Sequence, residues 1–311
     1  MSRVLALHLG LVALLLAMHF VLPAYHHGNL ARVMVLACYA IGFNILFGYT
    51  GLLSLGHALF FAAGMYGMGL AITQLGAAPA PALLAGLIAG LVVAGITGAL
   101  ALRTVGVAFM IVTLMFAQAG YLTILYFGDI THGDEGFVIQ PAQRVLWGLD
   151  LSDPSWRYLA AWALFSACLI ASLALVRHPF GRTLTAIREN EERARLLGYD
   201  VALRKWVAVV ISGGISALSG AAYGLLFGYA GASFASVQYS IFPLLWVLLG
   251  GAGTVLGPFI GTLFMFYLID LTSGITTAYM LLAGVVLVLL TLFAPQGLVG
   301  EVRRRGWGWL P

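Results

Sequence analysis

The chain has 311 residues, of which 62% are hydrophobic and only 8% are charged, and its mean hydropathy is +1.01. A soluble globule of this length would need far more polar surface, so the composition indicates an integral membrane protein. The formal net charge of +4 does not indicate a nucleic-acid partner, because an arginine excess in membrane proteins usually reflects cytoplasmic loops that face anionic lipid.

Apolar runs of membrane-spanning length follow one another along the first half of the chain. A spanning helix needs about 20 apolar residues, and such runs lie at 4–22, 30–47, 52–75, 81–102, 105–127 and 158–176. The first run lacks the small-residue cleavage site of a signal peptide, so we expect an uncleaved helix. Cys38 and Cys168 lie within these runs and are predicted to be small buried hydrophobes rather than disulfide or metal ligands.

Further spans are predicted after residue 205. The runs at 206–229 and 278–293 are clear, whereas 233–271 is long and is broken by Pro243 and by the sequence GGAGTVLGP. We expect a hairpin of two short helices there, and the pattern leaves open whether it is re-entrant or two full spans. The fold class is therefore an all-α polytopic membrane protein of about ten helices. Glycine pairs four residues apart, at Gly86 with Gly90 and at Gly257 with Gly261, predict close helix packing.

Charge sets the predicted orientation. The segment from Arg177 to Lys205 holds seven of the 15 basic and four of the 11 acidic residues, which places it in the cytoplasm. The loop at 128–157, richer in acidic residues, is then periplasmic, and both chain termini are cytoplasmic.

A short repeat supports this topology. LFGYTG at 46–51 recurs as LFGYAG at 226–231, and the predicted topology places the two copies on opposite faces. This pattern indicates a five-plus-five inverted repeat, with the substrate path near the midplane. The alternative is a chance match in a chain with 39 glycines.

The polar segment contains residues that typically start and end a short surface helix. Pro179 ends the preceding span, good helix formers fill 183–197, and Gly198 can close the helix in a left-handed conformation. The alternative is a solvated connector. Two features favour the helix over the connector. The first is a set of predicted i,i+4 ion pairs, which are Arg188 with Glu192, Glu189 with Arg193, and Glu191 with Arg195. The second is a predicted apolar stripe made of Leu184, Ile187, Ala194 and Leu197.

Polar residues in the early glycine-rich region are candidates for a substrate path. Asn44, Ser54 and His57 lie in apolar surroundings, and Ser54 and His57 are three residues apart, on one face of a predicted helix. The alternative is hydrogen bonding between packed helices. Ionisable residues near the predicted spans are scarce, with Asp270 and His57 identified there, which disfavours an ion-coupled secondary transporter.

Catalytic and metal sites are not expected. The chain contains no GxxxxGK[ST], HExxH or GxSxG sequence, so we predict no nucleotide site and no catalytic residue in it. Histidines at 26, 27 and 132 lack the spacing of a metal site.

Several segments resemble the LivM-type subunit of bacterial ABC permeases for branched-chain amino acids. They are HPFGRTLTAIRENEERARLLGYDVALRKWVAVVISGGISALSGAAYG at 178–224, GYTGLLSLGHALFFAAGMYG at 48–67, LLGGAGTVLGPFIGTL at 248–263 and APQGLVG at 294–300. The resemblance therefore spans most of the chain in order, from residue 48 to residue 300. The resemblance implies one transmembrane permease domain over 1–311 in the bacterial inner membrane, and the family also includes permeases for urea and short amides.

The resemblance also implies partners and a coupling site. The partners would be a second similar permease, a periplasmic amino-acid-binding protein and two cytoplasmic ATPase subunits, which would use ATP and Mg²⁺; this chain would hold no cofactor. The segment 178–204 would couple to the ATPase, with Gly181 allowing a tight turn into the helix. The coupling residues would be Gly181, Arg182, Arg188, Glu189, Asn190, Glu191, Arg195 and Gly198. Import of urea or short amides, or less favourably ion-coupled transport, remain the alternatives.

Overall fold

The computed structural model describes residues 3–305 and is almost entirely helical. Six of its helices are long and apolar enough to cross a membrane, and four shorter apolar helices accompany them, so the prediction of about ten membrane helices is confirmed for the described residues. The long ones are α1 (Arg3–Val21), α2 (Ala24–Asn44) with its π-helical continuation η1 (Ile45–Tyr49), α4 (Pro79–Ala101), α5 (Val107–Tyr126), α7 (Pro154–Arg177) and α10 (Val201–Phe227). The shorter ones are α3 (His57–Thr73), α11 (Val237–Gly250), α12 (Gly257–Ser273) and α13 (Tyr279–Phe293).

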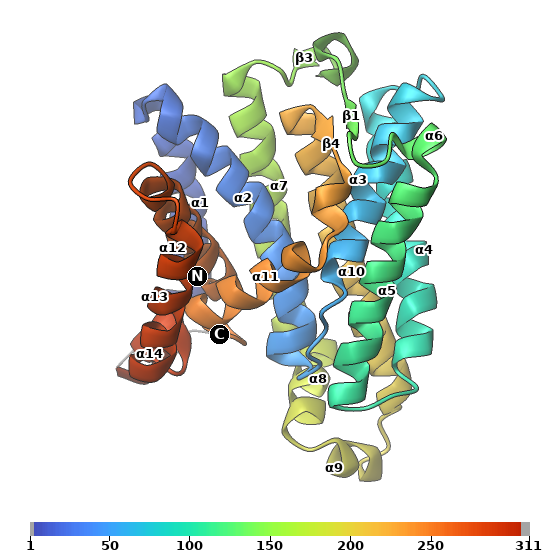
Figure 1. Ribbon diagram of the computed structural model, residues 1–311. Helices are drawn as coiled ribbons and strands as arrows, with labels where there is room; N and C mark the ends of the chain where they lie inside the picture. The colour runs from blue at the N-terminus through green and yellow to red at the C-terminus, as the bar shows by residue number, and fades with distance from the viewer. Residues whose placement is uncertain (1–2, 306–311) are drawn as a thin grey trace.

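Small elements mark the two ends of this bundle (Figure 1). One end, the α8–α9 end, carries α8 (Pro179–Glu189), α9 (Glu191–Leu196) and α14 (Gly297–Arg305). The other, the strand end, carries α6 (Gly128–Thr131), the short helix η2 (Pro141–Arg144) and four two-residue strands, and a further short helix, η3 (Ala232–Ala235), joins the last of these strands to α11. The antiparallel pairs are β1 (Phe137–Val138) with β4 (Tyr229–Ala230), and β2 (Val145–Leu146) with β3 (Leu149–Asp150). The terminal residues 1–2 and 306–311, whose cytoplasmic location the sequence predicts, lie outside the described range.

The two copies of the LFGY repeat lie at opposite ends of the bundle. The first follows α2 at the α8–α9 end, and the second follows α10 at the strand end (Figure 1). The left-handed glycine falls at different positions in the two copies, at Gly51 (φ 76°) in the first and at Gly228 (φ 73°) in the second, a conformation that glycine adopts without a steric penalty. The chain after each copy returns into the bundle before the next helix starts. This is the arrangement expected of inverted halves.

The helices that follow the repeats, α3 and α11, meet near their first turns, where the Ala58 amide donates to Ser240 Oγ at 3.1 Å. α11 has 14 residues, a length of about 21 Å against a hydrocarbon core of about 30 Å. It therefore starts inside the bundle and runs to the α8–α9 end, and α12 returns to the strand end (Figure 1). The hairpin predicted for 233–271 is thus one short helix, α11, followed by one returning helix, α12.

Pro243 does not break this hairpin, contrary to the prediction. It lies inside α11, where proline removes one backbone donor and leaves the carbonyl four residues earlier unpaired. That carbonyl, Tyr239 O, accepts the Tyr39 hydroxyl at 3.0 Å instead. The chain breaks only between Gly250 and Gly257, where Gly251 and Gly253 have positive φ.

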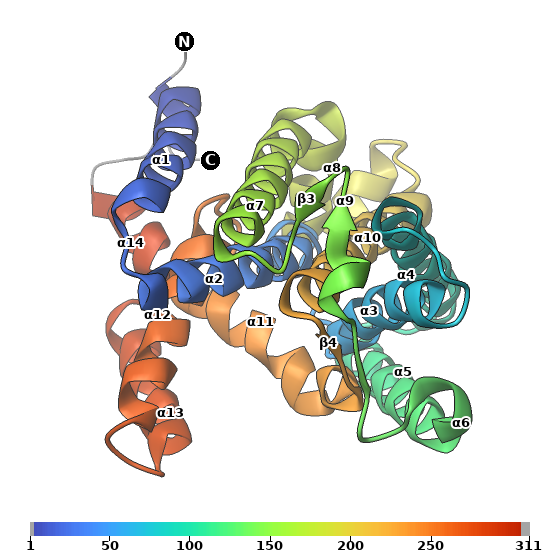
Figure 2. The ribbon, with the colours of Figure 1, turned by 90° about the horizontal axis from the view of Figure 1, so that it is seen from above.

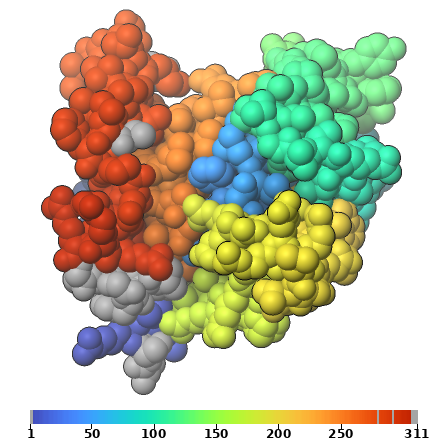
Figure 3. Space-filling model, turned by 90° about the horizontal axis from the view of Figure 1, so that it is seen from below, coloured from blue at the N-terminus to red at the C-terminus, as the bar shows by residue number. Residues whose placement is uncertain are grey.

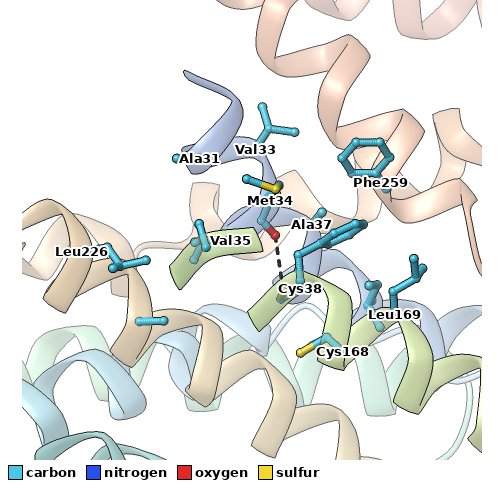
Figure 4. Packing of buried hydrophobic residues seen from close by; sticks show 14 of the residues in the cluster. Ala31, Val33, Met34, Val35, Ala37, Cys38, Cys168, Leu169, Leu226 and Phe259 are labelled. Atoms are coloured by element: carbon cyan, nitrogen blue, oxygen red, sulfur yellow. Dashed lines mark hydrogen bonds between the residues drawn. The ribbon is translucent and has the colours of Figure 1, made fainter. Parts of the chain in front are cut away.

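The core is built around α2, which is buried along most of its length. Seen from above, α2, α7 and α10 lie between α3–α5 on one side and α12–α13 on the other (Figure 2). Where α2 and α7 cross, Cys38 and Cys168 are free thiols packed among apolar side chains, and Cys38 Sγ donates to Met34 O at 3.3 Å (Figure 4). Their predicted role as buried hydrophobes is confirmed.

Glycines bring α3, α4 and α10 into backbone contact. A Cβ placed on Gly64 would lie 1.9 Å from the Ala217 carbonyl oxygen, and one on Gly220 would lie 1.9 Å from the Phe61 carbonyl oxygen. α4 presents small residues to this contact and large apolar residues outward, an arrangement typical of membrane helices. The inward set is Gly86, Gly90, Ala94 and Gly98, and the outward set is Leu84, Ile88, Val92 and Ile96. The packing role predicted for the glycine pairs is confirmed.

Candidate functional site

The polar segment at the α8–α9 end forms two helices rather than one. α8 begins at Pro179, since proline is tolerated in the first helical turn, and Gly181 approaches the end of α7 so closely that a Cβ would lie 2.3 Å from Leu175 O. Asn190 is extended (φ −159°, ψ 104°), which ends α8, and its side chain caps α9 by accepting from the Arg193 amide at 2.8 Å. Gly198 has φ 86° and closes α9 as predicted.

The break at Asn190 changes the predicted ion pairs. Two of them join residues on opposite sides of the break, and they do not form within the described chain. Glu191 does pair with Arg195 at 3.0 Å, and it also binds Lys205 Nζ at 2.5 Å. Glu191 therefore ties α9 to the start of α10.

The predicted apolar stripe is only partly correct. Leu184, Ile187 and Ala194 are buried against η1 and α10, but Leu197 is 70% exposed because the break turns α9 away from the bundle. Leu196 and Tyr199 are 88% and 41% exposed. These three residues, Leu196, Leu197 and Tyr199, form what we call the α9 tip, within the yellow segment of the face seen from below (Figure 3).

Arg188 joins the polar segment to both halves of the bundle. Its guanidinium donates to the Gly48 carbonyl at the end of η1, and a Cβ on Gly253 would lie 3.0 Å from the same guanidinium nitrogen. Asn44 makes a second connection, since its amide donates to Thr254 O at 2.9 Å and accepts from the Gly253 amide at 3.0 Å. The loop between α11 and α12 is thereby held against the end of the first repeat.

A cleft of about 560 Å³ lies beside Arg188, between this loop and α14. Arg303 and Arg304 line it together with Arg188. Glu301, also on α14, accepts hydrogen bonds from Arg304 and Arg305, and these bonds lower the pKa of the Glu301 carboxyl. Three arginines therefore line the cleft, and Glu301 offsets the charge of one of them, Arg304.

The three predicted path residues are buried at contacts between helices. His57 Nε2 lies 2.8 Å from Ser212 Oγ, which donates to Gly42 O at 2.6 Å, so His57 links α3 with α10 and α2. Ser54 Oγ accepts from the Gly56 amide. Ser54 does not share a helical face with His57, because α3 begins only at His57 and the residues before it are not helical. A role for Asn44, Ser54 and His57 in a substrate path stays a prediction.

A second cavity, of about 340 Å³, opens toward the strand end, between α2, α10, α11, α12 and α13. We call it the aromatic cavity. Its walls combine aromatic and aliphatic side chains with one carboxylate, and they comprise Leu36, Tyr223, Tyr239, Phe242, Trp246, Phe266, Ile269, Asp270, Ser273 and Met280.

Arg32, on α2 near this cavity, was not among the ionisable residues identified near the predicted spans. It lies inside α2, with its guanidinium 5.3 Å from the centre of the Phe227 ring. The signal that identifies it is a charge within an apolar run, which is costly in a membrane helix and usually functional.

Six long and four shorter apolar helices among residues 3–305 define a polytopic helical membrane protein. The chain belongs to the family of permease components of branched-chain amino acid transport systems, because that family's sequence profile matches residues 27–294. This confirms the resemblance to LivM-type permeases.

Individual relatives agree with the family. The high-affinity branched-chain amino acid transport system permease protein LivM of Salmonella typhimurium is 30% identical over 295 residues, which cover 87% of this chain and 69% of the relative. The protein of the same name from Escherichia coli gives the same figures. The autoinducer 2 import system permease protein LsrC of Photorhabdus laumondii is 29% identical over 133 residues, or 40% of this chain and 39% of the relative.

Proposed function

We propose that this chain is the permease subunit of an ATP-driven importer of branched-chain amino acids, and that α8 and α9 dock on a cytoplasmic ATPase subunit. The observation that carries the docking is the α9 tip. Its two leucines are exposed among charged residues, at an end of the bundle that also carries the helix α14 with its three arginines. Apolar side chains grouped in such a polar, water-facing region mark a protein contact rather than a lipid contact.

The distribution of charge supports this orientation. The basic residues of α8, α9 and α14, and those at the adjoining ends of α7 and α10, lie at the α8–α9 end (Figure 1). Basic residues collect on the cytoplasmic side of membrane proteins, so the α8–α9 end faces the cytoplasm and the strand end faces the periplasm. In this orientation a binding protein delivers substrate at the strand end, a second permease completes the path, and two ATPase subunits use ATP and Mg²⁺ below the membrane.

The contacts of α8 supply a route for coupling. Gly181 fixes the start of α8 on the end of α7, and Arg188 holds its last turn on Gly48. Because Gly48 also lies against the loop between α11 and α12, a displacement of α8 by the ATPase acts on both inverted halves. Rigid-body movement of this kind is a common way to switch between outward and inward states.

Arg188→Ala should separate assembly from coupling. We expect the variant to insert and to bind the ATPase subunits, but to lower substrate-stimulated ATP hydrolysis about tenfold, because a hydrogen bond from a charged donor contributes roughly 1.5–3 kcal/mol. The measurement is ATP hydrolysis by the reconstituted complex with and without loaded binding protein. Arg103→Ala is the matched control, since Arg103 is exposed in the loop between α4 and α5, outside the docking helices. Normal stimulation in Arg188→Ala would reject the coupling route.

A further inference from the structure

Two charged side chains at the strand end lie within helices of the bundle, outside the coupling segment. Asp270, on α12, lines the aromatic cavity. Its Oδ2 accepts from the Asn29 amide at 3.1 Å and from the Tyr25 hydroxyl, both on α2. These donors hold the carboxylate in place at the cavity wall, and a carboxylate has lone pairs for further donors.

Arg32 lies on α2, one of the helices that form the wall of the cavity, and its neighbours connect it to that wall. It precedes Leu36, a cavity-lining residue, by four positions on α2, so both side chains project from one face of the helix. Its guanidinium stands over the Phe227 ring, and that ring contacts Tyr223 of the cavity wall with 4.7 Å between ring centres. Arg32 is exposed.

Arg32 and Asp270 do not neutralise other charged side chains among the described residues. Neither takes part in any of the ion pairs formed among residues 3–305. An ionised group in a membrane helix is costly unless a partner of opposite charge compensates it. A negative group at the cavity wall, Asp270, and a positive group on the wall helix α2, Arg32, therefore lack such partners among the described residues.

The size and lining of the cavity indicate which ligand could bring a negative group to Arg32 and a positive group to Asp270. Its volume of about 340 Å³ is at the lower end of the range of roughly 300–1,000 Å³ for small-molecule sites. Phe242, Trp246 and Phe266 give it an apolar wall suited to an aliphatic side chain. A free amino acid carries a carboxylate, which a guanidinium binds through paired hydrogen bonds, and an ammonium, which a carboxylate binds.

We infer that the aromatic cavity is a substrate site for an aliphatic amino acid in its zwitterionic form, in which Arg32 binds the α-carboxylate and Asp270 the α-ammonium. The aromatic wall contacts the side chain. This inference rests on the proposed function and deepens it, because it names the two residues that bind the charged groups of the amino acid. A neutral ligand such as urea or a short amide would leave both charges without a partner, so the site discriminates against it.

Direct ligand binding to the purified complex without its binding protein tests this assignment. The wild-type complex should bind leucine saturably and should bind a neutral amide such as isobutyramide at least about tenfold more weakly. Arg32→Ala and Asp270→Asn should each weaken leucine binding by about tenfold or more. Arg103→Ala and Asp150→Asn, which remove like charges away from the cavity, should bind leucine as the wild type does.

Ligand analogues separate recognition from a structural role. Leucinamide lacks the carboxylate, so Arg32→Ala should not weaken its binding, and 4-methylpentanoate lacks the ammonium, so Asp270→Asn should not weaken its binding. Equal loss for all ligands in both variants, unchanged leucine binding in both, or wild-type binding of isobutyramide as tight as that of leucine would overturn the inference. ATP-dependent leucine uptake by the full wild-type complex is measured in parallel. If uptake occurs and the variants bind leucine normally, only the site assignment fails, whereas absence of both uptake and binding rejects the proposed function as well.

Discussion

Replacing Leu196 and Leu197 together by serine should abolish ATP-driven transport while the permease remains folded in the membrane. Both side chains are largely exposed, so their removal takes no contact from the core of this chain. In the proposed complex they enter a cleft of the ATPase subunit, where truncating a central apolar residue typically costs at least about 2 kcal/mol, or roughly thirtyfold in affinity. The double variant should therefore lose the ATPase subunits during purification.

The measurement is co-purification of the ATPase subunits with tagged permease, followed by ATP hydrolysis. Leu75→Ser is the matched control, because Leu75 is 82% exposed after α3, at the opposite end of the bundle. The control should retain the ATPase. Recovery of equal amounts of ATPase with the double variant would show that the α9 tip is not the docking surface.

Gly220→Val should prevent the permease from folding. Its new Cβ would lie 1.9 Å from Phe61 O, a backbone atom of α3, so the two helices would have to separate along their length. Overpacking of a core commonly costs about 1–3 kcal/mol, and we expect at least about 3 kcal/mol here because no flexible side chain can move aside. Gly64→Val, which meets Ala217 O at the same distance, should have the same effect.

Two other glycines provide controls for the effect of valine in an apolar helix. Gly10 in α1 and Gly284 in α13 have nothing within 4 Å of an added Cβ. Their valine variants should give normal yields of monodisperse protein in detergent and a normal midpoint of thermal unfolding. A folded Gly220→Val variant with the same midpoint would contradict the tight contact between α3 and α10.

Most of the fold could be predicted from the sequence, because a bilayer requires long apolar helices and hydropathy identifies them directly. Hydropathy does not locate helix starts inside the bundle. The run predicted from residue 52 begins as a helix only at His57, because residues 50–56 return into the bundle without helical structure. The prediction that Pro243 breaks the hairpin is wrong for a related reason. The hydroxyl group that donates to Tyr239 O, and so allows proline inside α11, comes from Tyr39, 200 residues earlier.

The candidate sites depended even more on tertiary contacts. Gly198 was predicted correctly because its left-handed turn is a local property. The inward position of Arg188 was not predictable, since its acceptor, Gly48, is 140 residues away. The pairing of Asp270 with Asn29 spans 241 residues, so only the folded structure shows that Asp270 lies at a cavity with Arg32 nearby.

The most direct test of the proposed function is leucine uptake into proteoliposomes. They contain this permease with its partner permease and ATPase subunits, and loaded binding protein is added outside. We predict uptake that requires enclosed ATP and Mg²⁺ and does not respond to an imposed proton or sodium gradient. Uptake driven by such a gradient in vesicles that lack the ATPase subunits would contradict an ATP-driven importer and identify a secondary transporter.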